Sequence, residues 1–303
     1  MVAPCGAAVR DTPTVSVIVP FRTHGERLGG CLRALSEQTY PRERYRIIVV
    51  DNGCDGHVMQ RADLDAHVRV VKEPVPGSYA ARNRGVVCSD GEILAFTDAD
   101  CVPAADWLEK GVDALLAAPN AGLVGGRIEV SVADPHRPTA VEIFESMTSF
   151  RQRDYIERWQ FAATANLFTY RSIFDEVGPF CSQLPSLGDR EWGARVSRAG
   201  YRLVYAHDAS VMHPARRSLR ELMQRSARMA GGYFELARSG RLPRRELYGD
   251  AALALLPMRV MRETGSATGR VHKLRALAVF AIVVAVRSLE LLRLSSGGDP
   301  RWQ

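Results

Sequence analysis

The chain has 303 residues, of which 46% are hydrophobic and 24% are charged. This composition is close to that of ordinary globular proteins, and it excludes a disordered, collagen-like or coiled-coil chain. A chain of this length forms either one large α/β domain with an appendage or two ordinary domains.

The charge is distributed unevenly along the chain. Residues 214–303 contain 17 Arg and Lys against 7 Asp and Glu, a balance of +10, whereas residues 1–213 contain 23 and 27, a balance of −4. Together with the apolar runs of the C-terminal region, this asymmetry predicts contact with an anionic membrane surface and no binding of nucleic acid. The six cysteines form no CxxC pair, and residues 1–11 lack the features of a signal peptide. Both observations predict a cytoplasmic protein.

The first half of the chain alternates predicted strands with predicted helices. The strands are expected at 14–20, 45–53, 68–74 and 91–100, and the helices at 28–38, 77–87 and 106–117. Because strand and helix alternate at the pace of βαβ units, the sequence predicts an α/β fold with a mostly parallel sheet and helices on both faces.

Beyond residue 122 the predicted elements are mixed. They are a strand at 121–130, a helix at 139–160, a strand at 162–169, helices at 171–177 and 189–199, and a strand at 201–206. This part is expected to hold an acceptor site and to add antiparallel strands to the sheet edge. From residue 218 onward the pattern is helical. Its apolar run at 276–286 has 11 residues, whereas a bilayer span needs about 20, so the run predicts an interfacial, re-entrant or core helix.

Polar residues follow three of the predicted strands, where an open parallel sheet binds its ligands. They are Pro20-Phe21-Arg22, Asp51-Asn52 and Asp98-Ala99-Asp100. In an extended segment Asp98 and Asp100 would share one side, where two carboxylates favour a hard divalent cation. The alternative is that this acidic tripeptide only starts the next helix.

Several segments, in this order, resemble family 2 glycosyltransferases of the GT-A fold. They are VSVIVPFR, CLRALSEQTYPRERYRIIVVDNG, GSYAARNRG, ILAFTDADCVPAADWLE, FDEVGPF and LGDREWGARVSRAGYRLVYAHDASVMH. The resemblance implies a GT-A domain over 14–213, with a nucleotide-binding half (14–121) and an acceptor half (122–213). It leaves an N-terminal extension (1–13) and a basic helical C-terminal region (214–303), which the charge pattern suggests is membrane-associated.

The resemblance also implies roles for individual residues. Asp189 would be the general base, and Trp192 would line the acceptor side or pack in the core. Gly188 stands where the family has Glu before this Asp, which makes Glu191 a rival base. The metal ligands of a Mg²⁺ or Mn²⁺ site would be Asp98, Asp100 and His213. The nucleotide-sugar would be bound by Pro20, Phe21, Arg22, Asp51, Asn52, Gly77, Arg82, Asn83 and Asp98.

The function implied is an inverting transfer from a nucleoside-diphosphate sugar, of the UDP or dTDP type, to a hydroxyl of a glycan or lipid-linked acceptor. Such an enzyme would assemble cell-surface glycans or glycolipids on the inner face of the cell membrane, with homo-oligomerisation possible. Asp51-Asn52 replaces the common Asp-Asp pair and leaves the base open. Two alternatives remain: a nucleotide-sugar-binding protein without transferase activity, and a nucleotidyltransferase on a related fold.

Overall fold

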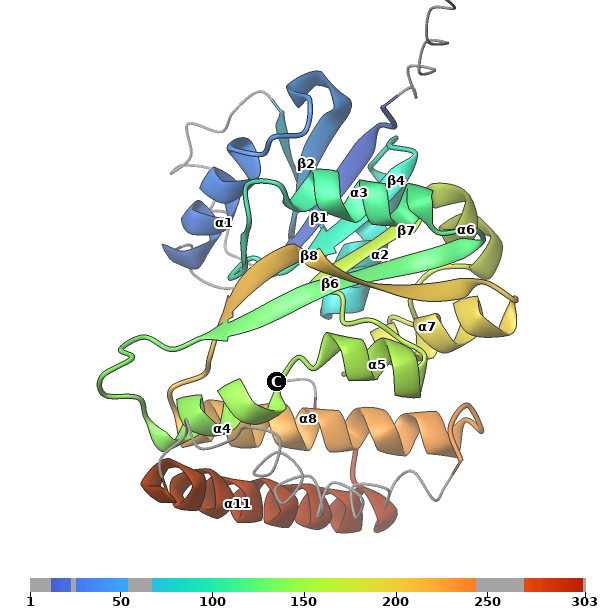
Figure 1. The fold of residues 1–303 in the computed structure, drawn as a ribbon. Helices are drawn as coiled ribbons and strands as arrows, with labels where there is room; N and C mark the ends of the chain where they lie inside the picture. Colours follow the sequence, from blue (N-terminus) through green and yellow to red (C-terminus); the bar gives the residue numbers. More distant parts are fainter. Residues whose placement is uncertain (1–11, 23–25, 54–66, 244–269, 302–303) are drawn as a thin grey trace, which may run out of the picture.

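The computed structural model describes residues 12–22, 26–53, 67–243 and 270–301. Its centre is an eight-stranded sheet with the strand order β3-β2-β1-β4-β7-β6-β8-β5 (Figure 1). The strands are β1 (Val15–Phe21), β2 (Tyr45–Asp51), β3 (Val68–Lys72), β4 (Ile93–Thr97), β5 (Val102–Pro103), β6 (Ala121–Ser131), β7 (Asn166–Tyr170) and β8 (Arg202–Pro214). The predicted N-terminal extension lies almost wholly outside the described residues.

Strands β1 to β4 run parallel to one another, as the alternation of elements predicted, and β6 also runs parallel to β8. β1 lies between β2 and β4 and runs parallel to both, and β2 runs parallel to β3. The residues of β1, VSVIVPF, are buried almost throughout, which is typical of a strand covered on both faces. In this register Phe21 pairs with Asp51, so the carboxyl ends of the strands lie side by side at one edge.

The antiparallel strands are placed differently from the prediction. β7 runs antiparallel to both β4 and β6 and therefore lies inside the sheet, while only the short β5, antiparallel to β8, lies at the edge. An interior position suits β7 because four of its five residues are buried. β8 extends to Pro214 along β6, with a register shift between Gly126 and Arg127, and is longer than the predicted 201–206.

Helices cover both faces of the sheet. One face packs against α1 (Glu26–Ser36) and α3 (Trp107–Ala117), and the opposite face against α2 (Ser78–Val87), α6 (Arg171–Val177) and α7 (Gly188–Arg198). A short 3₁₀ turn, η1 (Arg42–Arg44), precedes β2. These layers give the α/β architecture that the sequence predicted.

The single helix predicted over 139–160 is in fact two helices, α4 (Ala140–Thr148) and α5 (Gln152–Trp159). α4 begins with a capping box between Thr139 and Glu142. Between the helices the backbone of Phe150 is left-handed, with a φ of 54°, and its ring lies 4.3 Å from that of His213. The break therefore turns an aromatic side chain towards the end of β8.

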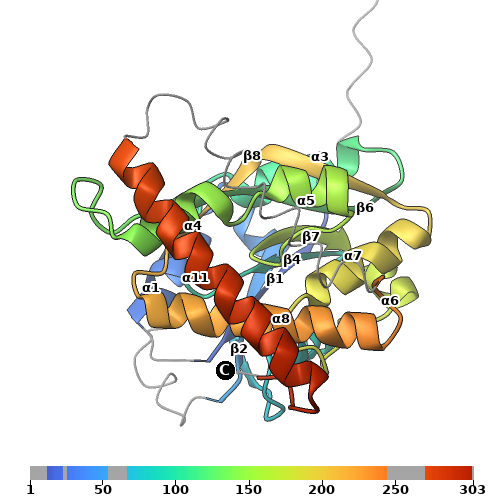
Figure 2. The ribbon, with the colours of Figure 1, turned by 90° about the horizontal axis from the view of Figure 1, so that it is seen from below.

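A third layer lies beneath the sheet and contains α4, α8 (Leu219–Arg238) and α11 (Arg270–Ser295) (Figure 1). Figure 2 shows α11 crossing α8 as the outermost element. The layer is held together by apolar side chains from all three helices, among them Phe144, Leu222 and Val279. None of the described helices combines the length and the apolar composition needed to cross a membrane. The division of the chain into two domains at residue 213 stays a prediction.

Candidate active site

The ends of three parallel strands bring several predicted residues together. Phe21 and Asp51 are buried at the ends of β1 and β2, and the carbonyl of Phe21 accepts a 2.8 Å hydrogen bond from the backbone N–H of Asn52. Pro20 is half-buried and Arg22 is exposed. Asp98 follows β4, the other neighbour of β1. The fold thus assembles these groups at one edge of the sheet, as ligand sites in such sheets require.

The side-chain amide of Asn52 is occupied by the protein itself. It donates to the carbonyls of Glu73 and Val75, at 2.9 and 2.6 Å, and accepts from the N–H of Gly77 at 2.8 Å. Gly77 precedes α2 and has a φ of 130°. This positive φ favours glycine because glycine has no Cβ atom. Asn52 therefore positions this loop and the start of α2 through its side-chain amide, and its contact with a base stays a prediction. Asp51 accepts a hydrogen bond from Gly53.

Arg82 on α2 holds Asp98. Its guanidinium is almost completely buried and donates to Asp98 Oδ1 at 2.5 Å and to the carbonyl of Ser78 at 3.2 Å. Residues 98–101 form a turn, closed by a 3.0 Å bond from the N–H of Cys101 to the carbonyl of Asp98. Because the segment is not extended, Asp98 and Asp100 do not share one face as predicted. The turn directs Asp98 towards Arg82 and Asp100 towards β8.

Asp100 faces His213 at the end of β8. The distance from Asp100 Oδ1 to His213 Nε2 is 3.6 Å, and His213 Nδ1 lies 2.9 Å from the carbonyl of Pro214. Since a carbonyl can only accept, Nδ1 carries the hydrogen, and Nε2 is the ring nitrogen that faces Asp100. Burial raises the pKa of Asp100, while the charge of His213 acts in the opposite direction.

Asp100 and His213 fit a hard divalent cation. A carboxylate oxygen and an imidazole nitrogen are both accepted by Mn²⁺, and the second ring nitrogen has the backbone partner that metal-binding histidines usually have. Cys101 lies within 4.8 Å of both groups, but burial raises the pKa of its thiol well above its ordinary value, which disfavours the thiolate that a metal would need. Of the three predicted ligands, the structure brings Asp100 and His213 together, while the Asp98 carboxylate is bound to Arg82.

Asp189 lies in the first turn of α7, after Leu187, whose φ is 66°. Its Oδ1 accepts hydrogen bonds from the Tyr79 hydroxyl at 3.2 Å and from the N–H of Arg190 at 2.9 Å. Burial raises the pKa of Asp189, and the charge of Arg82 opposes that shift. Arg82 thus connects the two ends of the site, because it binds Asp98 directly and acts electrostatically on Asp189.

Gly188 makes the contact between Tyr79 and Asp189 possible. A Cβ atom at position 188 would lie 2.7 Å from the Tyr79 ring, closer than atoms can pack without displacement. The residue that departs from the family's Glu-Asp pair therefore leaves room for Tyr79. Tyr79 is not among the predicted site residues, although it directly follows the Gly77-Ser78 helix start in the sequence.

Glu191, the rival base, is part of a buried ion pair. Its carboxylate accepts from Arg195 Nε at 3.0 Å and from Nη2 at 2.9 Å, and its side chain is 8% exposed. Arg195 also donates to the carbonyls of Val177 and Pro179. Glu191 therefore fixes the connection between α6 and α7.

Two further predicted residues, Trp192 and Asn83, make hydrogen bonds within the fold. Trp192 is fully buried, packs against the rings of Phe174 and Phe180 and donates from Nε1 to the carbonyl of Gly178. It lies in the core and does not line an acceptor pocket. Asn83 donates to the carbonyl of Phe180 and accepts from its N–H, at 2.8 and 3.0 Å. Its amide is thus used within the fold, and its place beside a nucleotide stays a prediction.

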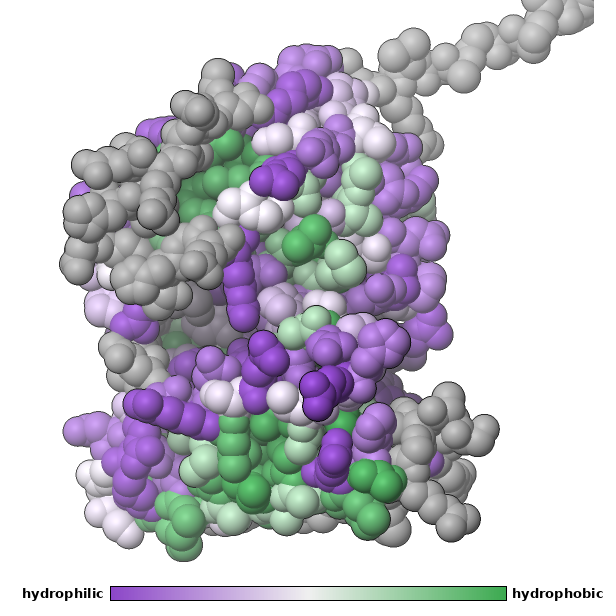
Figure 3. All heavy atoms as spheres, turned by 90° about the vertical axis from the view of Figure 1, so that its left-hand side faces the viewer, coloured by the Kyte–Doolittle hydropathy of each residue, from purple (hydrophilic) through white to green (hydrophobic). Residues whose placement is uncertain are grey.

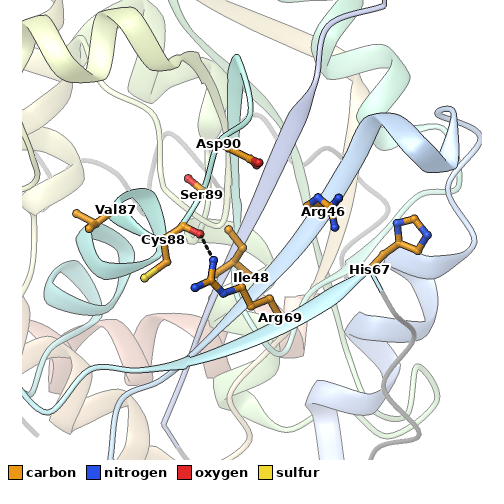
Figure 4. A pocket seen from close by; sticks show the side chains of 8 residues that line it. All are labelled: Arg46, Ile48, His67, Arg69, Val87, Cys88, Ser89 and Asp90. Carbon is orange, nitrogen blue, oxygen red and sulfur yellow. Dashed lines mark hydrogen bonds between the residues drawn. The ribbon is translucent and has the colours of Figure 1, made fainter.

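A hollow of about 500 Å³ lies at the opposite ends of β2 and β3 (Figure 4). Arg46, His67, Arg69 and Asp90 line it, and Arg69 donates to the carbonyl of Cys88 at 3.0 Å. It contains none of the predicted site residues.

The chain is similar to known glycosyltransferases. The family model described as glycosyl transferase family 2 matches residues 16–178. The chain belongs to glycosyltransferase family 2. Glycosyltransferase AglE of Haloferax volcanii is 38% identical over 248 residues, covering 80% of this chain and 79% of the relative. The pre-mycofactocin glycosyltransferase of Mycobacterium tuberculosis is 31% identical over 245 residues, covering 77% of this chain but only 49% of that relative.

Solved structures support the GT-A fold. The mannosyltransferase PcManGT from Pyrobaculum calidifontis, in complex with GDP-Man and Mn²⁺, aligns with a TM-score of 0.56 and 22% identity, covering 94% of this chain and 79% of the other. GalNAc-T7 with UDP, GalNAc and Mn²⁺ aligns with a TM-score of 0.53 and 17% identity, covering 68% and 44%. The predictions of a family 2 glycosyltransferase and of its fold are therefore confirmed.

Proposed function

We propose that this glycosyltransferase moves a sugar from a nucleoside-diphosphate sugar to an acceptor hydroxyl with inversion. One observation carries the proposal: a half-buried carboxylate, Asp189, lies across Arg82 from the acidic turn that contains Asp98 and Asp100. A base on one side and a diphosphate site on the other are what a direct displacement needs.

In the proposed reaction Asp189 accepts the proton of the acceptor hydroxyl. The hydroxyl oxygen forms a bond to the anomeric carbon while the bond from that carbon to the phosphate oxygen breaks, and the electron pair leaves with the nucleoside diphosphate. Tyr79 and the N–H of Arg190 orient the Asp189 carboxylate. Asp100 and His213 would hold Mg²⁺ or Mn²⁺, which would neutralise charge on the diphosphate. Glu191 is less suited to the base role because Arg195 already binds it.

The donor base and sugar remain open within this proposal. The sequence suggested UDP or dTDP, but the amide of Asn52 is used by the loop at 73–77 and is not free to select a base. The two solved structures were obtained with GDP-Man and with UDP. The donor panel must therefore include guanosine, uridine and thymidine diphosphates and their sugars.

A thermal-shift series tests the donor class. Each nucleoside diphosphate is added with Mn²⁺ and again with EDTA, and the midpoint of unfolding is measured. A ligand at 100 times its Kd stabilises the native state by about 2.7 kcal/mol, so at least one diphosphate should raise the midpoint in Mn²⁺ and less in EDTA. A nucleotide-binding protein without transferase activity would bind but release no diphosphate from the sugar donor with any acceptor. A nucleotidyltransferase would instead release pyrophosphate from a nucleoside triphosphate.

We also propose that α11 rests on an anionic membrane surface, which would bring a lipid-linked acceptor to the enzyme. Its outer side exposes Val271, Leu274, Val284, Leu289 and Leu292, each at least 37% accessible. Figure 3 shows apolar side chains gathered on the lowest layer of the molecule, flanked by hydrophilic ones. An exposed apolar face on a basic helix is typical of an interfacial helix.

Vesicle co-sedimentation tests the membrane contact. Replacing Leu274, Leu289 and Leu292 by Ser should lower binding to phosphatidylglycerol vesicles by about tenfold or more, since each buried leucine contributes about 1.5–3 kcal/mol at most. Val87→Ser on α2, where the side chain is 75% exposed, is the matched control and should leave binding unchanged. If the triple leucine variant binds vesicles as well as Val87→Ser does, the apolar face of α11 is not the membrane contact.

A further inference from the structure

Asn166, the first residue of β7, lies between the strand that leads into the acidic turn and the strand that contains His213. It pairs with Thr97, the last residue of β4, which directly precedes Asp98. On its other side β7 is followed in the sheet by β6 and then by β8 (Figure 1). Asn166 is fully buried, so its side-chain amide needs hydrogen-bond partners inside the fold.

The amide of Asn166 joins three elements. Its Oδ1 accepts a 2.9 Å hydrogen bond from Nε1 of Trp107, the first residue of α3. Its Nδ2 donates to the carbonyls of Arg127 on β6 and Ala209 on β8, both at 2.9 Å. An indole N–H can only donate and a carbonyl can only accept, so these partners fix the orientation of the amide.

The two carbonyls belong to an irregular part of the β6–β8 pair. Gly126 pairs with Ala206, but the next residue, Arg127, pairs with Ser210. Residues 207–209 of β8 therefore have no counterpart on β6 and form a bulge. Because side chains alternate along a strand, such an insertion changes which of the following residues lies at a given place on the sheet.

The bulge decides which residue of β8 faces Asp100. If the pairing before the bulge continued unbroken, Ser210 would lie opposite Val130. In the structure His213 takes that place, with its Nε2 3.6 Å from Oδ1 of Asp100. Bulges occur beside active sites because they re-aim a side chain in this way.

Position 126 leaves space for the bulge. A Cβ atom there would overlap both the carbonyl of Ala209 and the amide of Asn166. Glycine thus lets the backbone of β8 approach β6, and the amide of Asn166 binds the carbonyl that comes close. One glycine and one amide therefore hold the bulge in place.

We propose that Asn166 is a positioning residue for the metal site of Asp100 and His213. Its amide fixes the bulge that places His213, while its pairing with Thr97 and its bond to Trp107 hold the two ends of the segment that contains Asp100. A metal ion tolerates only small deviations in the distances to its ligands, so a displaced bulge weakens binding. The inference rests on the metal site of the proposed function and names the residue that sets the separation of its two ligands.

The affinity for Mn²⁺ separates this role from ordinary support of the core. We expect Asn166→Ala to lower the affinity of the folded full-length chain about tenfold to hundredfold, as is usual when a group that orients a metal ligand is lost. The measurement is the EPR signal of free Mn²⁺, with and without pyrophosphate. Asn166→Ser, whose hydroxyl can still donate to one carbonyl, takes its place if the alanine variant does not fold.

Thr169→Val is the matched control. Thr169 is a fully buried residue of the same strand, and its hydroxyl donates to the carbonyl of Gly122 at 2.6 Å, away from the bulge. This variant should lower the midpoint of thermal unfolding but keep the wild-type affinity for Mn²⁺. Gly126→Ala displaces the bulge while the Asn166 amide is still present, and it should lower the affinity as Asn166→Ala does.

The outcomes distinguish the inference from the function on which it rests. Wild-type Mn²⁺ affinity in the folded Asn166 variant overturns the inference and leaves the metal site intact. An equal loss of affinity in Thr169→Val also overturns it, because the effect would then come from general loosening of the sheet. A wild-type protein that binds no Mn²⁺, with or without pyrophosphate, refutes the metal site of the proposed function as well.

Discussion

Replacing Asp189 by Asn tests the assignment of the base most directly. Asparagine has nearly the same shape, and its carbonyl oxygen can still accept from the Tyr79 hydroxyl and the N–H of Arg190, which now bond Oδ1 at 3.2 and 2.9 Å. The substitution therefore removes basicity while the surroundings stay in place. A general base contributes roughly 10²- to 10⁴-fold, so kcat should fall by that factor, or about 3–5 kcal/mol of transition-state stabilisation.

The pH dependence gives a second readout. Because burial raises the pKa of Asp189 in the folded protein, the native state binds more protons than the unfolded state between the ordinary Asp pKa and the raised one. Stability therefore falls as pH rises through this window, and the loss is complete above the raised pKa. Asp189→Asn removes that loss and should be at least as stable as the wild type above the window. The wild-type kcat should rise with pH through the same window, and the variant should lack this rise.

Glu191→Gln is the comparison variant. It weakens a largely buried ion pair with Arg195, whose side chain is 24% exposed, so we expect a stability loss of about 1–3 kcal/mol and a change in kcat of less than about tenfold. Initial rates of diphosphate release and urea unfolding measure both quantities. If Asp189→Asn keeps wild-type turnover while Glu191→Gln loses it, the assignment of the base is wrong even though the family is established.

Three more substitutions test the site and its supports. Asp100→Ala should abolish the Mn²⁺-dependent part of nucleoside diphosphate binding in calorimetry, because it removes the carboxylate that faces His213; an unchanged affinity would contradict the metal assignment. Gly188→Glu should lower the unfolding midpoint and turnover together, since any Cβ there meets the Tyr79 ring at 2.7 Å; full activity would show that Tyr79 is dispensable. Asn83→Ala should cost about 1–3 kcal/mol in urea unfolding, since it leaves the Phe180 backbone without its partner; a smaller loss means that water replaces the amide.

The parallel half of the sheet was predictable because its strands are short apolar runs between turn-forming residues. The run VSVIVPF and the alternation of strands and helices that follows it are compatible with few sheet topologies other than a parallel one. The break between α4 and α5 was not predictable in the same way. No glycine or proline marks it. Phe150 adopts a left-handed conformation, which a residue other than glycine reaches only when tertiary contacts compensate for the strain. Here that contact is between the rings of Phe150 and His213. The position of β7 inside the sheet likewise depends on contacts between distant segments.

The sequence predicted where the candidate site lies in the fold, but it did not predict which role each of its residues has. Motif positions located Asp51, Asn52, Asp98 and Asp100 at one edge of the sheet. They could not show that residues 98–101 form a turn, which depends on the bond from Cys101 to the carbonyl of Asp98. A pattern of residue types contains no information about which hydrogen-bonding groups are already used inside the fold.

That information separates supporting residues from those that act on a ligand. The polar groups of Asn52, Asn83 and Glu191 are matched by protein partners, so their loss should appear first as lost stability. Burial of Asp189 and Asp100 instead favours their neutral forms. A negative charge on such a buried carboxylate is costly in the free protein, and it is compensated when a proton or a cation binds. Substitution of Asp100 should therefore leave the free protein no less stable and weaken the bound complex, whereas substitution of the supporting residues should destabilise both.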